Sequence, residues 1–346
     1  MTLCYARLAG PHLSLASAEL EAILEAEGLD ARLLSVHALV AFLDCRESPA
    51  RVAEALIGRA GFTRSVGVLL GVYEDPGALA AGAPGIARAL GGAGVVRVEA
   101  HRMLGLWRDA EPERDASRLA AALEALGLPV SPRGGRVVEI LYIEGFVAAG
   151  LVLARLDTKA FLARSPGRRP FFKPGPLDPF LSRVLVNLSR LRRGGVFWDP
   201  FCGTGGIALE ACLIGASRVL CGDLDPLMAR GSRVNLEHYG CSERSLCHMA
   251  DAASPPVVPG SVDAIATDPP YGRSTSLGGR SRELLYRGFL GEAYARLRPG
   301  SYIAFAAPSS LDAGSIASDA GFDVVGRYYM YVHGSLTREI IVARKV

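Results

Sequence analysis

The sequence has little that would place it in a membrane or outside the cell. None of its apolar runs reaches the roughly 18 residues that a bilayer-spanning helix needs. The longest candidate, residues 141–156, is interrupted by Glu144 and Arg155. No basic segment followed by an apolar stretch stands near the N-terminus, as a secretion signal would require. We therefore expect a cytoplasmic protein that makes no membrane contact.

Cysteine is also sparse, and its spacing carries no metal signature. The seven cysteines include no C-x-x-C pair. Cys241, Cys247 and His248 do not have the spacing of a structural zinc site. We therefore expect no metal, and we expect reduced cysteines because disulfides are rare in the cytosol.

The net charge is only +3 over 346 residues, but it is unevenly distributed. Residues 155–193 hold ten Lys or Arg against two Asp, which is a local charge of +8. Concentrated positive charge suits a polyanion such as RNA. A solvated linker followed by a basic helix face would give the same pattern.

Strand and helix patterns separate two regions of the chain. From residue 179 onward, apolar strand segments alternate with helices, which is typical of a doubly wound α/β layer. Its last two strands, 323–332 and 338–344, lie too close for a helical crossover and should form an antiparallel hairpin. The length suits two or three domains.

The N-terminal region mixes helices and strands. Residues 1–60 suggest strand, helix, strand and helix, with 35–44 as one buried strand. Residues 61–155 include two strands that flank Glu144-Gly145 as a hairpin. Prolines and glycines place a linker at 156–178.

Residues 196–211 have the pattern of a strand, a glycine-rich turn and a helix. Glycine lets the backbone approach a ligand closely, and the helix start offers free N–H groups. Gly203, Gly205 and Ala208 fit G-x-G-x-x-G/A, and Asp223 follows Gly203 by 20 residues, as in dinucleotide sites. These features alone fit a nicotinamide enzyme or an S-adenosylmethionine (SAM) enzyme. Asp199 favours SAM, because a carboxylate before the turn suits an ammonium and not a pyrophosphate.

Four aspartates each close a predicted strand: Asp199, Asp223, Asp251 and Asp268. Ligands bind beyond the carboxyl ends of parallel strands, so these side chains should meet along one rim. Asp268 begins Asp268-Pro269-Pro270-Tyr271, where the prolines fix the backbone and turn two carbonyls outward. These acceptors suit a planar exocyclic amine, with the Tyr271 ring stacked on the base. A strand that simply ends in a Pro-Pro turn is the alternative for these four residues alone.

Together these motifs resemble the class I SAM-dependent amino-methyltransferases. Three further segments make the resemblance more specific. They are residues 169–179, the extension of the proline turn through Gly272-Arg273-Ser274, and residues 333–340. They are similar to the archaeal tRNA guanosine-10 N2-methyltransferases and their eukaryotic catalytic-subunit relatives. The resemblance is strong over 168–346 and weaker over 1–160.

The resemblance implies a domain layout. Residues 179–346 would form a doubly wound, Rossmann-like methyltransferase sheet of seven strands with a reversed last strand. Residues 1–60 would form an α+β, ferredoxin-like segment, 61–155 a THUMP RNA-binding domain, and 156–178 a basic linker. Its partners would be tRNA and, as in the eukaryotic relatives, a small activating protein.

The motifs and the resemblance together assign the site residues. Catalysis is assigned to Asp268, Pro269 and Tyr271. SAM binding is assigned to Asp199, Phe201, Cys202, Gly203, Thr204, Gly205, Asp223, Leu224, Asp251, Ala252 and Leu177. RNA binding is assigned to Arg168, Arg169, Lys173 and Arg273.

The predicted function is methylation of the exocyclic N2 of a guanosine in tRNA, with G10 as the expected position. Adenine N6 in nucleic acid and a protein glutamine amide are alternative substrates, because related turns serve both. An RNA-binding scaffold without catalysis and an NAD-dependent enzyme are alternatives of other classes. The number of methyl groups, the tRNA species and the oligomeric state stay open.

Overall fold

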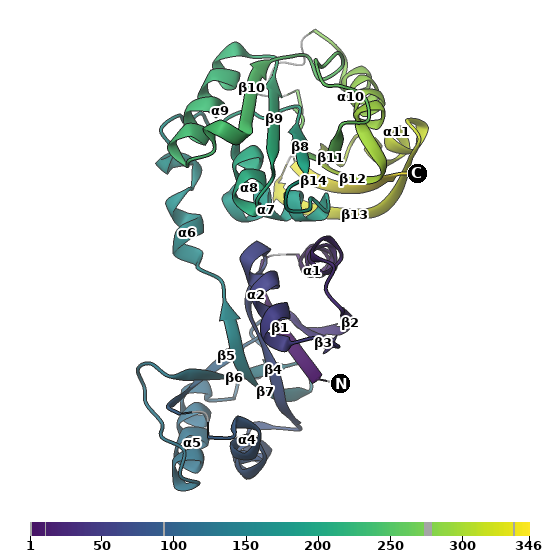
Figure 1. The fold of residues 1–346 in the computed structure, drawn as a ribbon. Helices are drawn as coiled ribbons and strands as arrows, with labels where there is room; N and C mark the ends of the chain where they lie inside the picture. The colour runs from purple at the N-terminus through teal and green to yellow at the C-terminus, as the bar shows by residue number, and fades with distance from the viewer. Residues whose placement is uncertain (1, 11, 93, 273–278, 335) are drawn as a thin grey trace. The chain divides into compact units, whose positions relative to one another are not determined.

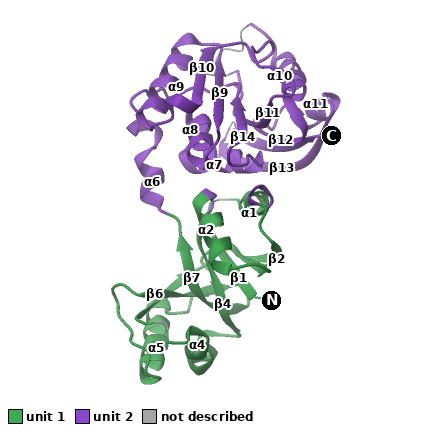
Figure 2. Ribbon diagram, in the orientation of Figure 1, with its two compact units in different colours: residues 1–24, 28–58, 63–156 green, residues 25–27, 59–62, 157–346 purple. Residues whose placement is uncertain are grey.

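The computed structural model describes residues 2–10, 12–92, 94–272, 279–334 and 336–346. The chain forms two compact units, coloured separately in Figure 2. Unit 1 comprises residues 1–24, 28–58 and 63–156, and unit 2 comprises 25–27, 59–62 and 157–346. Each unit has a seven-stranded sheet, and Figure 1 labels the elements. Among the described residues, no helix has the length and apolar character to cross a bilayer.

Unit 1 is built on a mixed sheet in the order β2-β3-β1-β4-β7-β6-β5. Among the described strands of this sheet, β5 and β6 pair in parallel and the other neighbours are antiparallel. The pairing of β1 with β4 carries one sheet across residue 60, where the sequence suggests a domain boundary. The elements are β1 (Thr2–Leu8), α1 (Leu13–Glu27), β2 (Ala31–His37), β3 (Val40–Cys45), α2 (Pro49–Arg59), β4 (Thr63–Tyr73), α3 (Pro76–Ala81), α4 (Ala83–Leu90), β5 (Val96–Arg102), α5 (Pro112–Ala125), β6 (Arg136–Ile143) and β7 (Phe146–Arg155).

The prediction of one buried strand at 35–44 is wrong. The structure has a hairpin there, with His37 paired to Val40 across the turn. Ala38 and Leu39 between them have positive φ angles of 43° and 69°. Two such residues in succession make the tight turns that join antiparallel strands, and Asn-Gly is the usual sequence for them. An apolar pair in this role carries no turn signal, so the two strands merge into one run in the sequence.

Unit 2 contains a second sheet in the order β10-β9-β8-β11-β12-β14-β13. Strands β8 to β12 pair in parallel, whereas β14 is antiparallel to both of its neighbours. The elements are α6 (Thr158–Ala163), η1 (Pro166–Arg168), α7 (Pro179–Leu188), β8 (Val196–Asp199), α8 (Gly206–Ile214), β9 (Arg218–Asp223), α9 (Pro226–His238), η2 (Ser242–Arg244), β10 (Ser245–Met249), β11 (Val262–Thr267), α10 (Arg282–Arg296), β12 (Leu297–Pro308), α11 (Ala313–Asp319), β13 (Phe322–His333) and β14 (Leu336–Lys345). The strand order reverses between β8 and β11, which is where open α/β sheets bind ligands.

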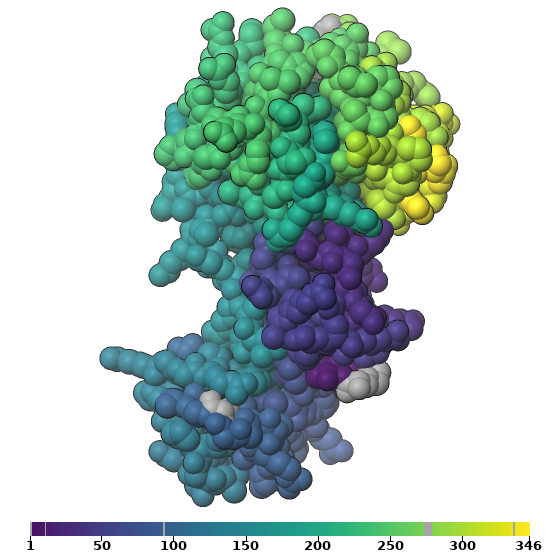
Figure 3. Space-filling view, in the orientation of Figure 1, coloured from purple at the N-terminus to yellow at the C-terminus, as the bar shows by residue number. Residues whose placement is uncertain are grey.

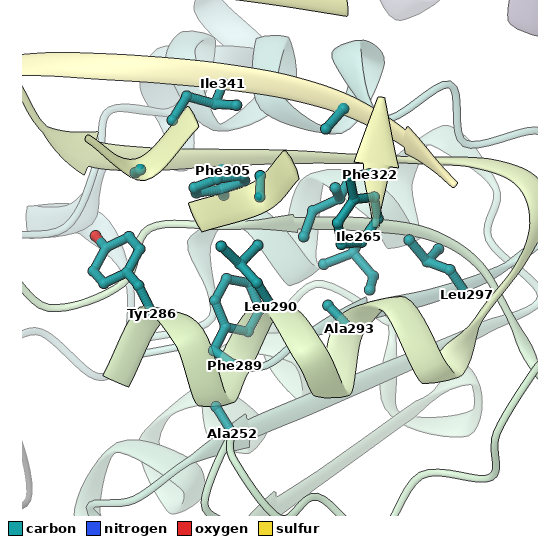
Figure 4. Close-up of a cluster of buried hydrophobic side chains, with 14 of the residues drawn as sticks. Ala252, Ile265, Tyr286, Phe289, Leu290, Ala293, Leu297, Phe305, Phe322 and Ile341 are labelled. Carbon is teal, nitrogen blue, oxygen red and sulfur yellow. The ribbon is translucent and has the colours of Figure 1, made fainter. Parts of the chain in front are cut away.

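Helix α10 covers one face of this sheet. Tyr286, Phe289, Leu290 and Ala293 recur at helical spacing and are fully buried. Figure 4 shows these side chains pointing at the sheet residues, Phe305 among them. The chain ends at the surface of unit 2, in yellow in the space-filling view (Figure 3). This packing holds β11, which leads into the Asp-Pro-Pro-Tyr turn, and its neighbouring strand β12 in place.

A disulfide joins Cys212 of α8 to Cys241, with Cα atoms 6.2 Å apart. The prediction that all cysteines are reduced is therefore wrong for this pair. A separation of 29 residues belongs to no recognised spacing pattern, so the sequence alone does not indicate the bond. It ties α8, the helix after the glycine-rich turn, to the segment that follows α9.

We expect removal of this bond to lower the melting temperature. Closing a loop of about 30 residues stabilises a protein by about 3–4 kcal/mol in the chain-entropy model. In a unit of this size that corresponds to a fall of about 6–16 °C. Calorimetry of the double variant Cys212→Ala/Cys241→Ala measures it. Reductant should lower the wild type to the same value and leave the variant unchanged; equal responses of both proteins to reductant would contradict the expectation.

Candidate active site

A cavity of about 1190 Å³ opens at the carboxyl ends of the unit 2 strands. This exceeds the roughly 300–1,000 Å³ of an ordinary small-molecule pocket, so it has room for two ligands. The structure brings most of the predicted site residues to its wall. They are Lys173, Leu177, Phe201, Cys202, Gly203, Thr204, Asp223, Leu224, Asp251, Ala252, Asp268, Pro269 and Tyr271.

The glycine-rich turn needs glycine at two positions for different reasons. Gly203 and Gly205 both lie in the left-handed region, with φ angles of 48° and 80°. A Cβ on Gly205 would also lie 3.0 Å from Cβ of Ser232 in α9. Gly205 itself is not in the cavity wall and acts as the cap before α8. The turn therefore faces the cavity with its backbone at Gly203 and packs against α9 at Gly205.

Asp199 lies at the end of β8, behind the wall, and is 1% exposed. Its Oδ1 accepts a hydrogen bond from Thr267 Oγ1 at 2.7 Å, a contact that the sequence does not reveal. Its Oδ2 is buried without a hydrogen-bond partner. Burial raises the pKa of this carboxyl to about 7. A buried carboxylate oxygen with no donor is costly, and a cationic donor would satisfy it.

Asp223 ends β9, and its carboxylate accepts hydrogen bonds from two backbone N–H groups. Its Oδ2 accepts from the N–H of Gly203 and its Oδ1 from the N–H of Asp225, both at 2.9 Å. Burial raises its pKa. The carboxylate thus fixes the glycine-rich turn and still has acceptor capacity facing the cavity.

Asp251 follows β10 and makes an ion pair that the sequence does not indicate. Both of its oxygens accept from the guanidinium of Arg280, and its Oδ1 also accepts from the N–H of Ala253 at 2.9 Å. The hydrogen bond from Arg280 lowers the pKa of Asp251. Both side chains are partly exposed, so the pair contributes little stability and can open for a ligand.

The Asp268 carboxylate is joined to two other cavity residues. The Tyr271 hydroxyl donates to Asp268 Oδ1 at 2.5 Å and accepts from Arg338 Nε at 2.9 Å. A second Arg338 nitrogen lies 3.7 Å from Asp268 Oδ2. Burial raises the pKa of Asp268, against the opposing effects of Arg338 and Tyr271. Stacking of the Tyr271 ring on a base stays a prediction.

Residues 166–340 match one protein family, the RMKL-like methyltransferase domain. The match covers half of the chain. The protein belongs to this family. The assignment supports S-adenosyl-L-methionine as the cofactor, in agreement with the sequence analysis.

Similar proteins agree with the resemblance drawn from the motifs. The tRNA (guanine(10)-N2)-dimethyltransferase of Methanothermobacter thermautotrophicus is 44% identical over 194 residues, 56% of each chain. The tRNA (guanine(6)-N2)-methyltransferase of Thermus thermophilus is 34% identical over 229 residues, 62% of each chain. The chain thus matches 56–62% of the length of these relatives. The crystal structure of TrmN from T. thermophilus covers 99% of this chain at 25% identity, with a TM-score of 0.56.

The predicted RNA-binding residues differ in exposure. Arg168 is exposed and Lys173 lines the cavity, whereas Arg273 lies outside the described residues. Arg169 is 5% exposed, and its Nε donates to the Arg164 carbonyl at 2.9 Å. The prediction that Arg169 contacts RNA does not agree with this burial.

Two more arginines of the basic segment are buried around one acid. Glu210 of α8 accepts from Arg164 with both oxygens, at 2.5 and 3.0 Å, and from Arg183 Nε at 2.8 Å. The side chains of all three residues are at most 8% exposed. Part of the charge that the sequence offers to a polyanion is therefore neutralised inside unit 2.

A group of possible metal ligands, Glu99, His101 and Glu139, lies in unit 1. Burial alone would raise the pKa of Glu139, but the neighbouring His101 and the charge of Arg7 hold the pKa at about 2. Arg155 also pairs with Glu139 at 2.9 Å. Arginine side chains thus occupy the positions that a cation would take, and the cluster is an ion-pair network.

Proposed function

We propose that the protein transfers a methyl group from SAM to the exocyclic N2 of a guanosine in tRNA, with G10 as the expected position. The observation that carries the proposal is the placement of Asp268, Pro269 and Tyr271 on the wall of the cavity that the glycine-rich turn also lines. The relatives described above modify guanine N2 at positions 10 and 6, and the position-10 relative is the more similar.

The residues present fit the cofactor. The unpartnered Oδ2 of Asp199 suits the methionyl ammonium, and backbone N–H groups of 202–205 suit the carboxylate. Asp223 has acceptor capacity for the ribose hydroxyls, and Asp251 would accept from the adenine amine once Arg280 is displaced. Phe201, Leu177 and Ala252 supply apolar wall.

Asp268 and Pro269 would position the nucleophile. The Asp268 carboxylate and the Pro269 carbonyl accept the two N2 hydrogens, which aims the nitrogen lone pair at the methyl carbon. As the C–N bond forms and the C–S bond breaks, positive charge moves to nitrogen, where the Asp268 carboxylate stabilises it. The nitrogen then loses a proton, to Asp268 or to water. The guanine has to leave its stack to reach this position, and ring stacking on Tyr271 would return about 1–3 kcal/mol.

Mass spectrometry of nucleosides tests this function. The protein is incubated with isotopically labelled SAM and an unmodified tRNA transcript, a DNA duplex or a glutamine-containing protein substrate. We expect label in N2-methylguanosine from tRNA alone. Label in adenine or in protein would support the alternative substrates. SAM binding without any transfer would indicate a scaffold.

We also infer that unit 1 binds RNA, with a ferredoxin-like segment followed by a THUMP domain. The order β1-α1-β2-β3-α2-β4 and the sheet order β2-β3-β1-β4 support the first part, because they are those of a ferredoxin-like unit. The fourth strand, β4, would then extend this segment from residue 60 to Tyr73. The activating protein subunit stays an expectation from the resemblance.

SAM affinity should depend on pH through Asp199. Burial raises the pKa of this carboxyl to about 7, and the group has to be ionised to hold the methionyl ammonium. The Kd for SAM should therefore fall as pH rises from 5.5 to 7.5, by up to about tenfold per unit below the pKa. Asp199→Asn should weaken binding at least about tenfold at pH 7.5 and flatten the pH dependence.

Isothermal titration at several pH values measures this effect. Asp319→Asn is a matched control, because Asp319 is exposed and pairs with Arg287 away from the cavity wall. It should reproduce the wild-type pH dependence. An Asp199→Asn variant with the wild-type pH profile would show that another group binds the ammonium.

A further inference from the structure

Arg338 comes to the candidate active site from the far end of the chain. It lies on β14, paired with Pro308 of β12 and Met330 of β13. Its side chain is 12% exposed and lines the cavity. Residues 333–340 contributed to the family resemblance, but the sequence analysis assigned no role to Arg338. Its guanidinium nevertheless contacts both members of the Asp268–Tyr271 pair.

The hydrogen bonds among these three residues have a direction. Arginine can only donate, so the Tyr271 oxygen accepts from Arg338 Nε. That contact turns the tyrosine proton toward Asp268 Oδ1. A carboxylate oxygen can accept two hydrogen bonds, so Asp268 retains acceptor capacity for an incoming amine. Arg338 therefore fixes the hydroxyl, and the hydroxyl fixes the carboxylate.

We propose that Arg338 is a positioning residue for methyl transfer, which keeps Asp268 ionised and holds the Tyr271 ring in place while the substrate amine binds. This inference rests on the proposed function of the same cavity. Arg338 contacts the acceptor residue and not the transferred group. Its loss should therefore impair the chemical step more than SAM binding.

Asp268 is surrounded by groups from several elements. Tyr271 comes from its own turn, Asp199 from β8, Tyr286 from α10 and Arg338 from β14. Asp178, which caps α7, also acts on Arg338. Of these groups only Arg338 is cationic.

Four other basic side chains line the cavity wall, Lys173 among them. Arg280 pairs with Asp251, and Arg282 donates to Ser310 at 3.3 Å. His333 lines the wall as well. Arg338 lies within 4 Å of the Asp268 carboxylate. Removing its charge would leave a half-buried acid beside Asp199, which favours the protonated form of Asp268.

The test compares Arg338→Met with Arg338→Lys by measuring kcat, KM for tRNA and SAM affinity across pH. An opposite charge at this distance shifts an acid's pKa by about 1–3 units. For Arg338→Met we expect the acidic limb of kcat to move up by about 1–3 units, with at least a tenfold lower kcat at pH 7. SAM affinity should stay within about twofold. Arg338→Lys should return the acidic limb of kcat to its wild-type pH and recover part of kcat, because it keeps the charge but loses the fixed Nε donor.

Arg344→Met is the matched control, since Arg344 is an exposed arginine of the same strand that donates to the Gly300 carbonyl. It should leave kcat and its pH profile unchanged. If Arg338→Met is unstable, the test uses Arg338→Lys, Tyr271→Phe and the double variant Arg338→Lys/Tyr271→Phe. Each single variant should lower kcat. The fold decrease in kcat of the double variant should be smaller than the product of the two single decreases.

Three outcomes would overturn the role of Arg338. They are an unmoved acidic limb in a folded Arg338→Met variant, additive losses in the double variant, and a defect confined to KM for tRNA, which would make Arg338 a phosphate contact. The proposed function fails in a different way. A wild-type protein that binds SAM and methylates no guanosine would reject the function before any variant is compared.

Discussion

Asp268→Ala should abolish methyl transfer while SAM binding persists. The variant removes the acceptor that orients the amine and the negative charge that stabilises the developing cation. Losses of this kind amount to about 10²–10⁴-fold each, so we expect at least a 10³-fold lower kcat. Single-turnover transfer of a labelled methyl group to tRNA measures the chemical step. Isothermal titration should give a Kd for SAM within a few fold of wild type.

Two further variants sharpen this result. Asp268→Asn keeps the shape of the side chain and one acceptor oxygen, so it should retain more activity than Asp268→Ala but far less than wild type. Asp323→Ala removes an exposed aspartate on β13 and should behave like wild type. If the kcat of Asp268→Ala lies within a few fold of wild type, the catalytic role assigned to Asp268 is wrong.

The local parts of the candidate site could be predicted because each has its own backbone requirement. Gly203 and Gly205 have the left-handed angles that the turn requires. Asp199 and Asp223 end β8 and β9, and Asp268 directly follows β11. The Glu144-Gly145 hairpin also forms, with Ile143 paired to Phe146. In each case the residue type and its neighbours in sequence carry the information.

Contacts between distant segments could not be predicted in this way. Arg338 reaches Tyr271, 67 residues away, because β14 inserts between β12 and β13. Thr267 reaches Asp199 across 68 residues because β8 and β11 are neighbours in the sheet. Neither contact has a sequence signature, since both depend on the strand order. The disulfide depends likewise on how α8 and the end of α9 pack.

The basic segment shows a related limit. Counting charge over 155–193 treats every arginine as exposed, yet Arg164, Arg169 and Arg183 are buried. The deciding partner is Glu210, an acid on the buried side of α8 that looks like an ordinary helix residue in the sequence. Arg164 also packs on the Phe161 ring, 3.9 Å from its centroid. Charge in this segment therefore serves the fold as well as any polyanion.

Glu210→Ala should destabilise unit 2 strongly, because it leaves Arg164 and Arg183 buried without their common partner. Breaking a buried ion pair by removing one member costs about 3–5 kcal/mol. Urea unfolding followed by circular dichroism measures the change. Glu237→Ala is the control, since Glu237 pairs with Arg233 on the surface at 3.8 Å, and its removal should cost at most about 1 kcal/mol.

The double variant Glu210→Ala/Arg164→Met should recover part of the lost stability, because it removes one of the two buried positive charges. A single Glu210→Ala variant as stable as Glu237→Ala would mean that both guanidinium groups reach solvent when the acid is removed, and that the buried cluster does not anchor residues 157–169 to α8.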